Sequence, residues 1–172
     1  VDKTFPTYWE LIKKIGIGIV PIDKIIDYKK IILVGMPGCG KSTLGKLLEE
    51  KLGFEIADLD KLIEHELSST IPEIIGRHGW SKFRDIESTK LYTLLNDTCK
   101  NKWRCISTGG GVIENHISRN LLENGVIIWI KRDLESIKLS LNEENRKLPN
   151  TLENLMKSRQ KYYENLSDYI YY

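Results

Sequence analysis

The run from residue 35 to residue 43, GMPGCGKST, combines glycine, lysine and hydroxyl side chains at a spacing that suits phosphate binding. It matches the pattern G-x-x-x-x-G-K-[ST], in which glycines let successive backbone N–H groups point at phosphate oxygens. The lysine then reaches the β- and γ-phosphates, and the next hydroxyl can bind Mg²⁺. We predict that this loop binds ATP with Mg²⁺. The predicted nucleotide-binding residues are Gly35, Gly38, Gly40, Lys41, Ser42 and Thr43.

The sequence on either side of the loop favours this interpretation over an ordinary glycine-rich turn. The apolar run at 31–34 is short and rich in β-branched residues, as expected of a strand buried on both faces. Residues 41–52 follow, with leucines at 44, 47 and 48 on one side of a predicted helix. The positive end of that helix would face the phosphates. Strand, loop and helix in this order are the context that phosphate binding requires.

Two carboxylates flank one leucine in Asp58-Leu59-Asp60, at the end of a second predicted strand. In an open α/β sheet, ligands bind at the carboxyl ends of the strands. Alternation along the chain would let one carboxylate face a metal while the other meets a substrate hydroxyl. Helix N-capping is the alternative, and it accounts for one aspartate but not for both.

Other residues could form an acceptor site at the same edge. The glycines at 109–111 follow a predicted strand, and they would let a small ligand approach the backbone. Arg84 and Glu87 lie three residues apart on a predicted helix, a spacing that can hold a guanidinium for bidentate capture of a carboxylate. Arg146 lies in a polar stretch, 142–149, where it could serve a mobile lid. A flexible turn and solvated surface charges are the alternatives for these residues taken singly.

The composition of the 172-residue chain is that of one ordinary domain, with 41% hydrophobic and 29% charged residues. A formal charge of +2 is too small to indicate nucleic acid or a membrane surface as a partner. No apolar run reaches the length of a membrane helix. Three cysteines without framework spacing predict free thiols and a cytoplasmic protein. The histidines show no metal-ligand spacing.

The predicted elements alternate between strand and helix. Strands are expected at 31–34, 54–57, 103–107, 126–131 and 168–172, and helices at 41–52, 61–67, 71–77, 81–97, 117–123, from 133 onward and at 152–164. This alternation predicts a parallel sheet with helices on both faces. Trp80, Trp103 and Trp129 fall within or beside these elements, which assigns them to the core.

The motifs, taken in order, resemble those of shikimate kinase. GMPGCGKST, DLD, FRDIE, STGGGV and MKSRQKYY follow one another as they do in that family, from about residue 31 to the end of the chain. The resemblance implies an α/β P-loop NTPase fold of the nucleoside-monophosphate-kinase-like type, with three layers, a parallel five-stranded sheet and a mobile lid. It also implies transfer of the γ-phosphoryl group of ATP to the 3-hydroxyl of shikimate, a step of chorismate and aromatic amino acid biosynthesis.

The same resemblance implies roles for individual residues. Lys41 and Arg146 would act on the phosphates, Asp60 would accept the proton of the shikimate hydroxyl, and Ser42 and Asp58 would support the metal. Three of only seven arginines occupy family positions, which suggests that those positions need the geometry of the guanidinium group. The implied shikimate-binding residues are Asp60, Phe83, Arg84, Gly109, Gly110, Gly111 and Arg159.

The two ends of the sequence suggest a larger polypeptide. Residues 3–6, KTFP, followed by Tyr8, resemble the C-terminal end of EPSP synthase, which precedes shikimate kinase in the fused AROM polypeptide. We therefore expect residues 1–29 to be the tail of such a domain plus a linker. Residues 30–172 would be the shikimate-kinase-like domain without its last helix. The absence of an initiator methionine fits a segment covalently fused to other enzymes of the pathway.

Two other functions remain compatible with a phosphate-binding loop. One is another small-molecule or nucleoside monophosphate kinase of the same fold. The other is a nucleotide-binding module that has lost catalysis and serves as a structural part of a fused chain. Arg84 and Arg159 favour an acceptor with a carboxylate over the first alternative. The intact loop and both aspartates disfavour the second.

Overall fold

The computed structural model describes residues 30–97, 103–144 and 150–172. The predicted domain tail at 1–29 and the predicted lid residue Arg146 lie outside the described residues. The elements follow one another in the chain as β1 (Lys30–Val34), α3 (Lys41–Leu52), β2 (Glu55–Asp58), α4 (Leu59–Leu67), α5 (Ile71–Asn96), β3 (Arg104–Ser107), the 3-10 helix η1 (Val112–Glu114), α6 (His116–Leu122), β4 (Val126–Ile130), α7 (Leu134–Glu144), α8 (Leu152–Leu166) and β5 (Tyr169–Tyr171).

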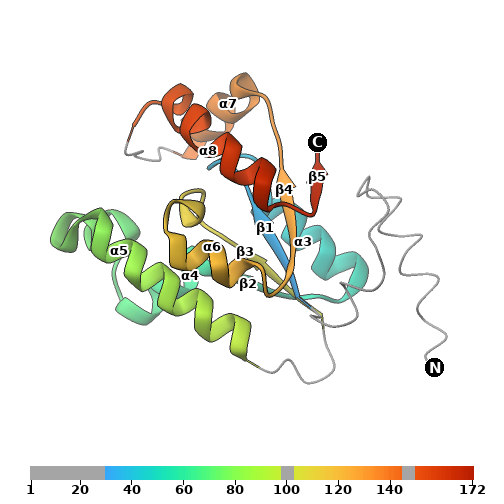
Figure 1. Cartoon of the computed structure of the whole chain (residues 1–172), viewed down its shortest axis with the longest axis horizontal. Coiled ribbons are helices and arrows are strands. Elements are labelled where there is room, and N and C mark those ends of the chain that lie inside the picture. Colours follow the sequence, from blue (N-terminus) through green and yellow to red (C-terminus); the bar gives the residue numbers. More distant parts are fainter. Residues whose placement is uncertain (1–29, 98–102, 145–149) are drawn as a thin grey trace.

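The strands form one parallel five-stranded sheet in the order β2-β3-β1-β4-β5. β3 and β4 are buried along their whole length and β1 along all but its first residue, whereas the edge strands β2 and β5 are partly exposed. Figure 1 shows α3 on one side of the sheet and α5 and α6 on the other. Apolar runs without alternation suit strands covered on both faces. The predicted fold class, a parallel sheet between helices, is confirmed.

Aromatic residues join the elements in the core. Trp129 of β4 stacks on Tyr163 of α8 at 5.7 Å between ring centroids, and Phe54 lies 6.1 Å from Trp103. Burial of each large apolar side chain contributes about 1.5–3 kcal/mol. The prediction that Trp80 belongs to the core is wrong, because this side chain is 40% exposed.

Several element boundaries differ from the predicted ones by one or two residues, two predicted helices are merged, and one of these differences affects the site. The predicted helices at 71–77 and 81–97 form the single element α5, which is broken only by Gly79 with φ 78° and ψ 167°. The fourth helix begins at Leu59, because Asp58 caps it by accepting a hydrogen bond from the backbone N–H of Lys61 at 3.2 Å. Asp60 therefore lies in the first turn of α4. Alternation around Leu59 does not apply, because Asp58 ends β2 and Asp60 belongs to α4, and the alternative of N-capping is confirmed for Asp58.

In the ranges that the structure describes, no helix combines the length and the apolar character needed to cross a membrane.

Candidate active site

The phosphate-binding loop connects the carboxyl end of β1 to the N-terminus of α3, which has the predicted bounds. Gly40 is the N-cap of α3 with φ 99°, a conformation that favours glycine. Gly35 has φ 147°, and a Cβ atom there would lie 2.6 Å from the carbonyl oxygen of Ile130 on β4. The glycines of this motif are thus required by backbone geometry and by the close approach of a neighbouring strand.

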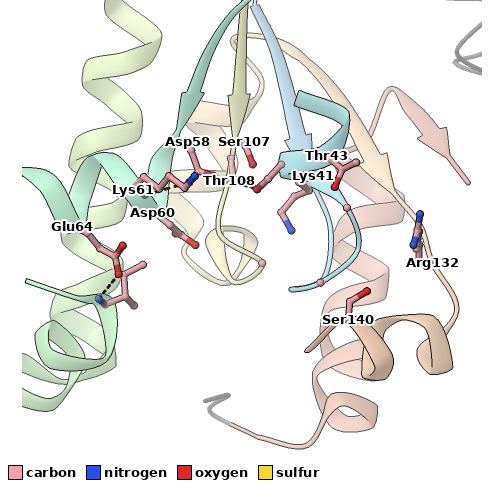
Figure 2. A pocket seen from close by; sticks show the side chains of 15 residues that line it. Lys41, Thr43, Asp58, Asp60, Lys61, Glu64, Ser107, Thr108, Arg132 and Ser140 are labelled. Atoms are coloured by element: carbon pink, nitrogen blue, oxygen red, sulfur yellow. Dashed lines mark hydrogen bonds between the residues drawn. The ribbon is translucent and has the colours of Figure 1, made fainter. Parts of the chain in front are cut away.

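Lys41 is almost buried, with 8% of its surface exposed. Its Nζ donates to the carbonyl oxygens of Gly35 at 3.0 Å and Met36 at 2.8 Å, so that the loop itself satisfies the ammonium group. Lys41 and Asp60 point into the same cavity, and Arg132 lies across it from Asp58 and Asp60 (Figure 2). This cavity, about 540 Å³ in volume, is lined by five of the six predicted nucleotide-binding residues, all but Gly35, and is called the nucleotide cavity below. Its lining includes Gly38, Gly40, Lys41, Ser42, Thr43, Asp58, Asp60, Thr108 and Arg132.

The two predicted metal-supporting residues lie next to each other. The Ser42 hydroxyl donates to Oδ2 of Asp58 at 3.3 Å, while Oδ1 of Asp58 caps α4. Over the described ranges, no cluster of three or more His, Cys, Asp or Glu side chains could hold a metal by itself. A hydroxyl beside one carboxylate suits Mg²⁺, which takes few protein ligands and completes its shell with water and substrate phosphates. Ser42 and Asp58 therefore fit the predicted ion.

A second cavity of about 330 Å³ adjoins the first, with Asp60, Glu64, Ile71 and Gly110 lining both. Five separate parts of the chain supply its walls: the phosphate-binding loop through Pro37, α4, α5, the loop after β3, and α8. All of the predicted acceptor-binding residues line this second cavity, which is called the acceptor cavity below. They are Asp60, Phe83, Arg84, Gly109, Gly110, Gly111 and Arg159.

Glycine is the only residue that fits at 109 and 111 without displacing a polar group of the site. A Cβ atom on Gly109 would lie 2.7 Å from Oε1 of Glu87 and 2.8 Å from Oδ1 of Asp60. A Cβ atom on Gly111 would lie 1.8 Å from Nη2 of Arg84. Charged side chains thus pack directly against the backbone of the glycine turn.

The charges around the acceptor cavity form a connected cluster. Arg84 donates from Nη1 to Glu87 at 2.8 Å, and both Arg84 and Arg159 donate to Glu114. Burial alone would lower the pKa of Arg84, but the carboxylates of Glu87 and Glu114 raise it. Burial raises the pKa of Glu87 to about 7, with the charge of Asp60 adding to the effect and Arg84 opposing it. In the described part of the chain, Oε1 of Glu87 has no hydrogen-bond partner.

Several residues of the site were not assigned to it from the sequence, and three of them make charge or ring contacts there. Arg132 follows β4 at the carboxyl edge of the sheet, where ligands bind in open α/β sheets. Its place directly after a predicted strand could therefore have indicated a role in the site. Trp80 lines the acceptor cavity, where its ring lies 5.4 Å from the guanidinium carbon of Arg84. Glu114 contacts arginines 30 and 45 positions away, and no local pattern indicates such contacts.

A phosphate-binding loop at the end of β1, in a parallel sheet of order β2-β3-β1-β4-β5, defines a P-loop protein of the kinase type. Its nucleotide cavity opens onto an acceptor cavity with two arginines. Residues 37–172 match the family model described as "Shikimate kinase". The chain belongs to the shikimate kinase family.

Individual relatives agree with this assignment. The chain is 31% identical to the pentafunctional AROM polypeptide of Yarrowia lipolytica over an alignment 191 positions long, which covers 100% of this chain and 12% of that polypeptide. It is 42% identical to the shikimate kinase of Persephonella marina over 110 residues, covering 63% of this chain and 65% of that enzyme. A solved structure of the Acinetobacter baumannii shikimate kinase in complex with shikimate superposes with a TM-score of 0.77 at 30% identity, covering 88% of this chain and 87% of the other. The chain thus spans about an eighth of the length of the AROM relative.

Proposed function

We propose that this chain transfers the γ-phosphoryl group of ATP to the 3-hydroxyl of shikimate, in the pathway to chorismate and the aromatic amino acids. One observation carries the proposal: the nucleotide cavity and the arginine-lined cavity adjoin, with Asp60 in the wall of both. Phosphoryl transfer needs donor and acceptor in line and little covalent chemistry from the protein. Family membership supports the same reaction.

The nucleotide side would hold the phosphates with the loop amides, the N-terminus of α3 and Lys41. Ser42 and Asp58 would hold Mg²⁺, which would supply positive charge to neutralise the phosphates. Arg132 reaches the same cavity and adds a further positive side chain to those of Lys41 and Lys61. The role of Arg146 at the phosphates stays a prediction from the resemblance.

On the acceptor side, Asp60 would orient the 3-hydroxyl and take its proton as the oxygen attacks the γ-phosphorus, while the bond from that phosphorus to the bridging oxygen of the β-phosphate breaks and ADP leaves. Arg84 and Arg159 would bind the carboxylate of shikimate, since the fork of a guanidinium matches a carboxylate. The glycine turn at 109–111 and the Phe83 ring would close the pocket around the carbon ring of the acceptor.

The proposal also includes the fusion of this chain to other enzymes and the compartment in which it works. Because the AROM polypeptide aligns over the whole chain, we infer fusion to other enzymes of the pathway, with residues 1–29 as the tail of the preceding domain. Cys39 and Cys105 are buried free thiols, which suit a reducing compartment, and we place the enzyme in the cytoplasm.

The test is an ADP-release assay on the purified chain with Mg²⁺-ATP and a panel of acceptors. Shikimate should support turnover, whereas gluconate and nucleoside monophosphates should not. Shikimate with its carboxylate reduced to an alcohol should be a poor substrate, because the arginines lose their partner. Turnover with a nucleoside monophosphate in place of shikimate would support the rival kinase. ATP binding without turnover of any acceptor would support a module that has lost catalysis.

A further inference from the structure

One carboxylate, that of Glu114, connects the two arginines of the acceptor cavity. Its Oε1 accepts from Nε and Nη2 of Arg159 at 2.8 and 2.6 Å. Its Oε2 accepts from Nε and Nη2 of Arg84 at 3.2 and 2.9 Å. Each oxygen thus receives one edge of one guanidinium group, and the two arginines are held at a fixed separation.

Glu114 contacts the arginines without lining their cavity. Arg84 and Arg159 line the acceptor cavity, whereas Glu114 lines a separate surface hollow together with Arg84 and Arg119. A guanidinium carries five N–H donors. Arg159 uses only Nε and Nη2 on Glu114, so its Nη1 has no partner within the described ranges. Donors therefore remain for a carboxylate that enters the cavity.

The position of Glu114 is itself fixed by backbone hydrogen bonds. Its N–H donates to the carbonyl oxygen of Gly111 at 2.9 Å. Nη1 of Arg119 donates to the carbonyl oxygens of Ile113 at 2.8 Å and Glu114 at 3.1 Å. The bridge thus extends from an anchored turn of η1 to two long side chains, of which Arg84 is also held by Glu87 at 2.8 Å.

We propose that Glu114 is a positioning residue, which holds Arg84 and Arg159 at the spacing that receives the carboxylate of the acceptor. This inference rests on the proposed function. Two guanidinium groups side by side repel each other, and the bridging carboxylate offsets that repulsion. Affinity rises when binding groups are ordered before the ligand arrives. The specificity for a carboxylate would then depend on a residue that never touches the substrate.

The experiment compares Glu114→Gln with wild type in the 172-residue chain. Glutamine keeps the length of the side chain but has one accepting oxygen, so it can serve only one guanidinium. The side chain of Glu114 is 39% exposed, and solvent weakens the bridge. We expect the KM for shikimate to rise about three- to tenfold. The kcat and the KM for ATP should stay within about twofold of wild type. Glu123→Gln, which changes an exposed carboxylate at the end of α6, is the matched control and should alter neither KM.

The reduced alcohol analogue of shikimate separates positioning from a general structural role. Because Glu114 would act on the carboxylate through the arginines, Glu114→Gln should leave the KM for the analogue unchanged. Equal losses with both acceptors, together with a lower Tm, would show a purely structural role and overturn the inference. An unchanged or lower KM of Glu114→Gln for shikimate would also overturn the inference. A lower KM would show that Glu114 competes with the carboxylate of shikimate for the two arginines. Absence of shikimate turnover in wild type would instead remove the proposed function.

Discussion

Glu87 makes the stability of the protein depend on pH in a direction that can be derived from its surroundings. The side chain is fully buried, one oxygen accepts from Arg84, and burial raises the pKa to about 7 from the ordinary value of 4.5. Between these two pH values the folded chain keeps a proton that the unfolded chain releases. The free energy of unfolding should therefore be highest below pH 4.5, fall as pH rises toward 7, and change no further from this group above pH 7.

The size of this effect follows from the same two values. The difference between 4.5 and about 7 corresponds to about 3 kcal/mol, at about 1.4 kcal/mol for each pKa unit. Glu87→Gln replaces the group by a neutral amide of similar shape whose oxygen can still accept from Arg84. The stability of this variant relative to wild type should rise by about 3 kcal/mol between pH 4.5 and pH 7.5.

Urea unfolding followed by tryptophan fluorescence, at half-unit steps from pH 4.5 to pH 8, measures this difference directly. The control is Glu49→Gln, which replaces an exposed carboxylate on α3. Its free energy of unfolding should vary with pH in parallel with that of wild type, because water solvates this side chain in both the folded and the unfolded state. If the Glu87→Gln and wild-type curves also ran parallel, Glu87 would be charged in the folded protein over the whole range. The reasoning from its burial would then be refuted.

Three further substitutions test other parts of the site. Lys41→Ala should reduce kcat by roughly a hundredfold or more, because the ammonium lines the nucleotide cavity, and the chain should stay folded with a lower Tm because two hydrogen bonds are lost. Wild-type turnover would remove the loop from the mechanism. Asp60→Asn should lower kcat by about a hundredfold or more while the affinity for ATP, measured by calorimetry, stays nearly constant. An equal fall in ATP affinity would place Asp60 with the nucleotide. Gly111→Ala should raise the KM for shikimate at least about tenfold, since the new Cβ atom would displace the Arg84 guanidinium. The control is Gly45→Ala, whose Cβ atom would make only an ordinary contact at 3.6 Å and should leave this KM unchanged. An unchanged KM of Gly111→Ala for shikimate would show that Arg84 adapts freely.

The features that the sequence predicted well depend on short-range rules. The phosphate loop, the bounds of α3 and the five strands follow from local patterns of glycine and apolar residues. The acceptor residues were found because each lies in a motif of consecutive residues, and the parallel sheet then brings those motifs to one edge.

The features that were missed depend on contacts between distant segments. The start of α4 was predicted at 61 instead of 59, and the sequence alone does not show that Asp58 is a partner of Ser42 as well as a helix cap. Trp80 looks like a core residue by type, yet the break at Gly79 accompanies its exposure beside the acceptor cavity. The hydrogen bonds of Glu114 with Arg84 and Arg159 can form only when η1 is packed between α5 and α8 in the folded chain.

The two carbonyl bonds of Lys41 change what an affinity for nucleotide measures in this protein. A buried ammonium group without partners would cost several kcal/mol, and the carbonyl oxygens of Gly35 and Met36 remove that cost before any ligand arrives. If Lys41 binds nucleotide phosphates as proposed, these would have to compete with the two backbone carbonyl oxygens for the donors of the same ammonium group. The affinity for nucleotide would then reflect the difference between two sets of hydrogen bonds. A nucleotide whose phosphates do not reach Lys41 would leave the first set intact and would gain nothing from the lysine.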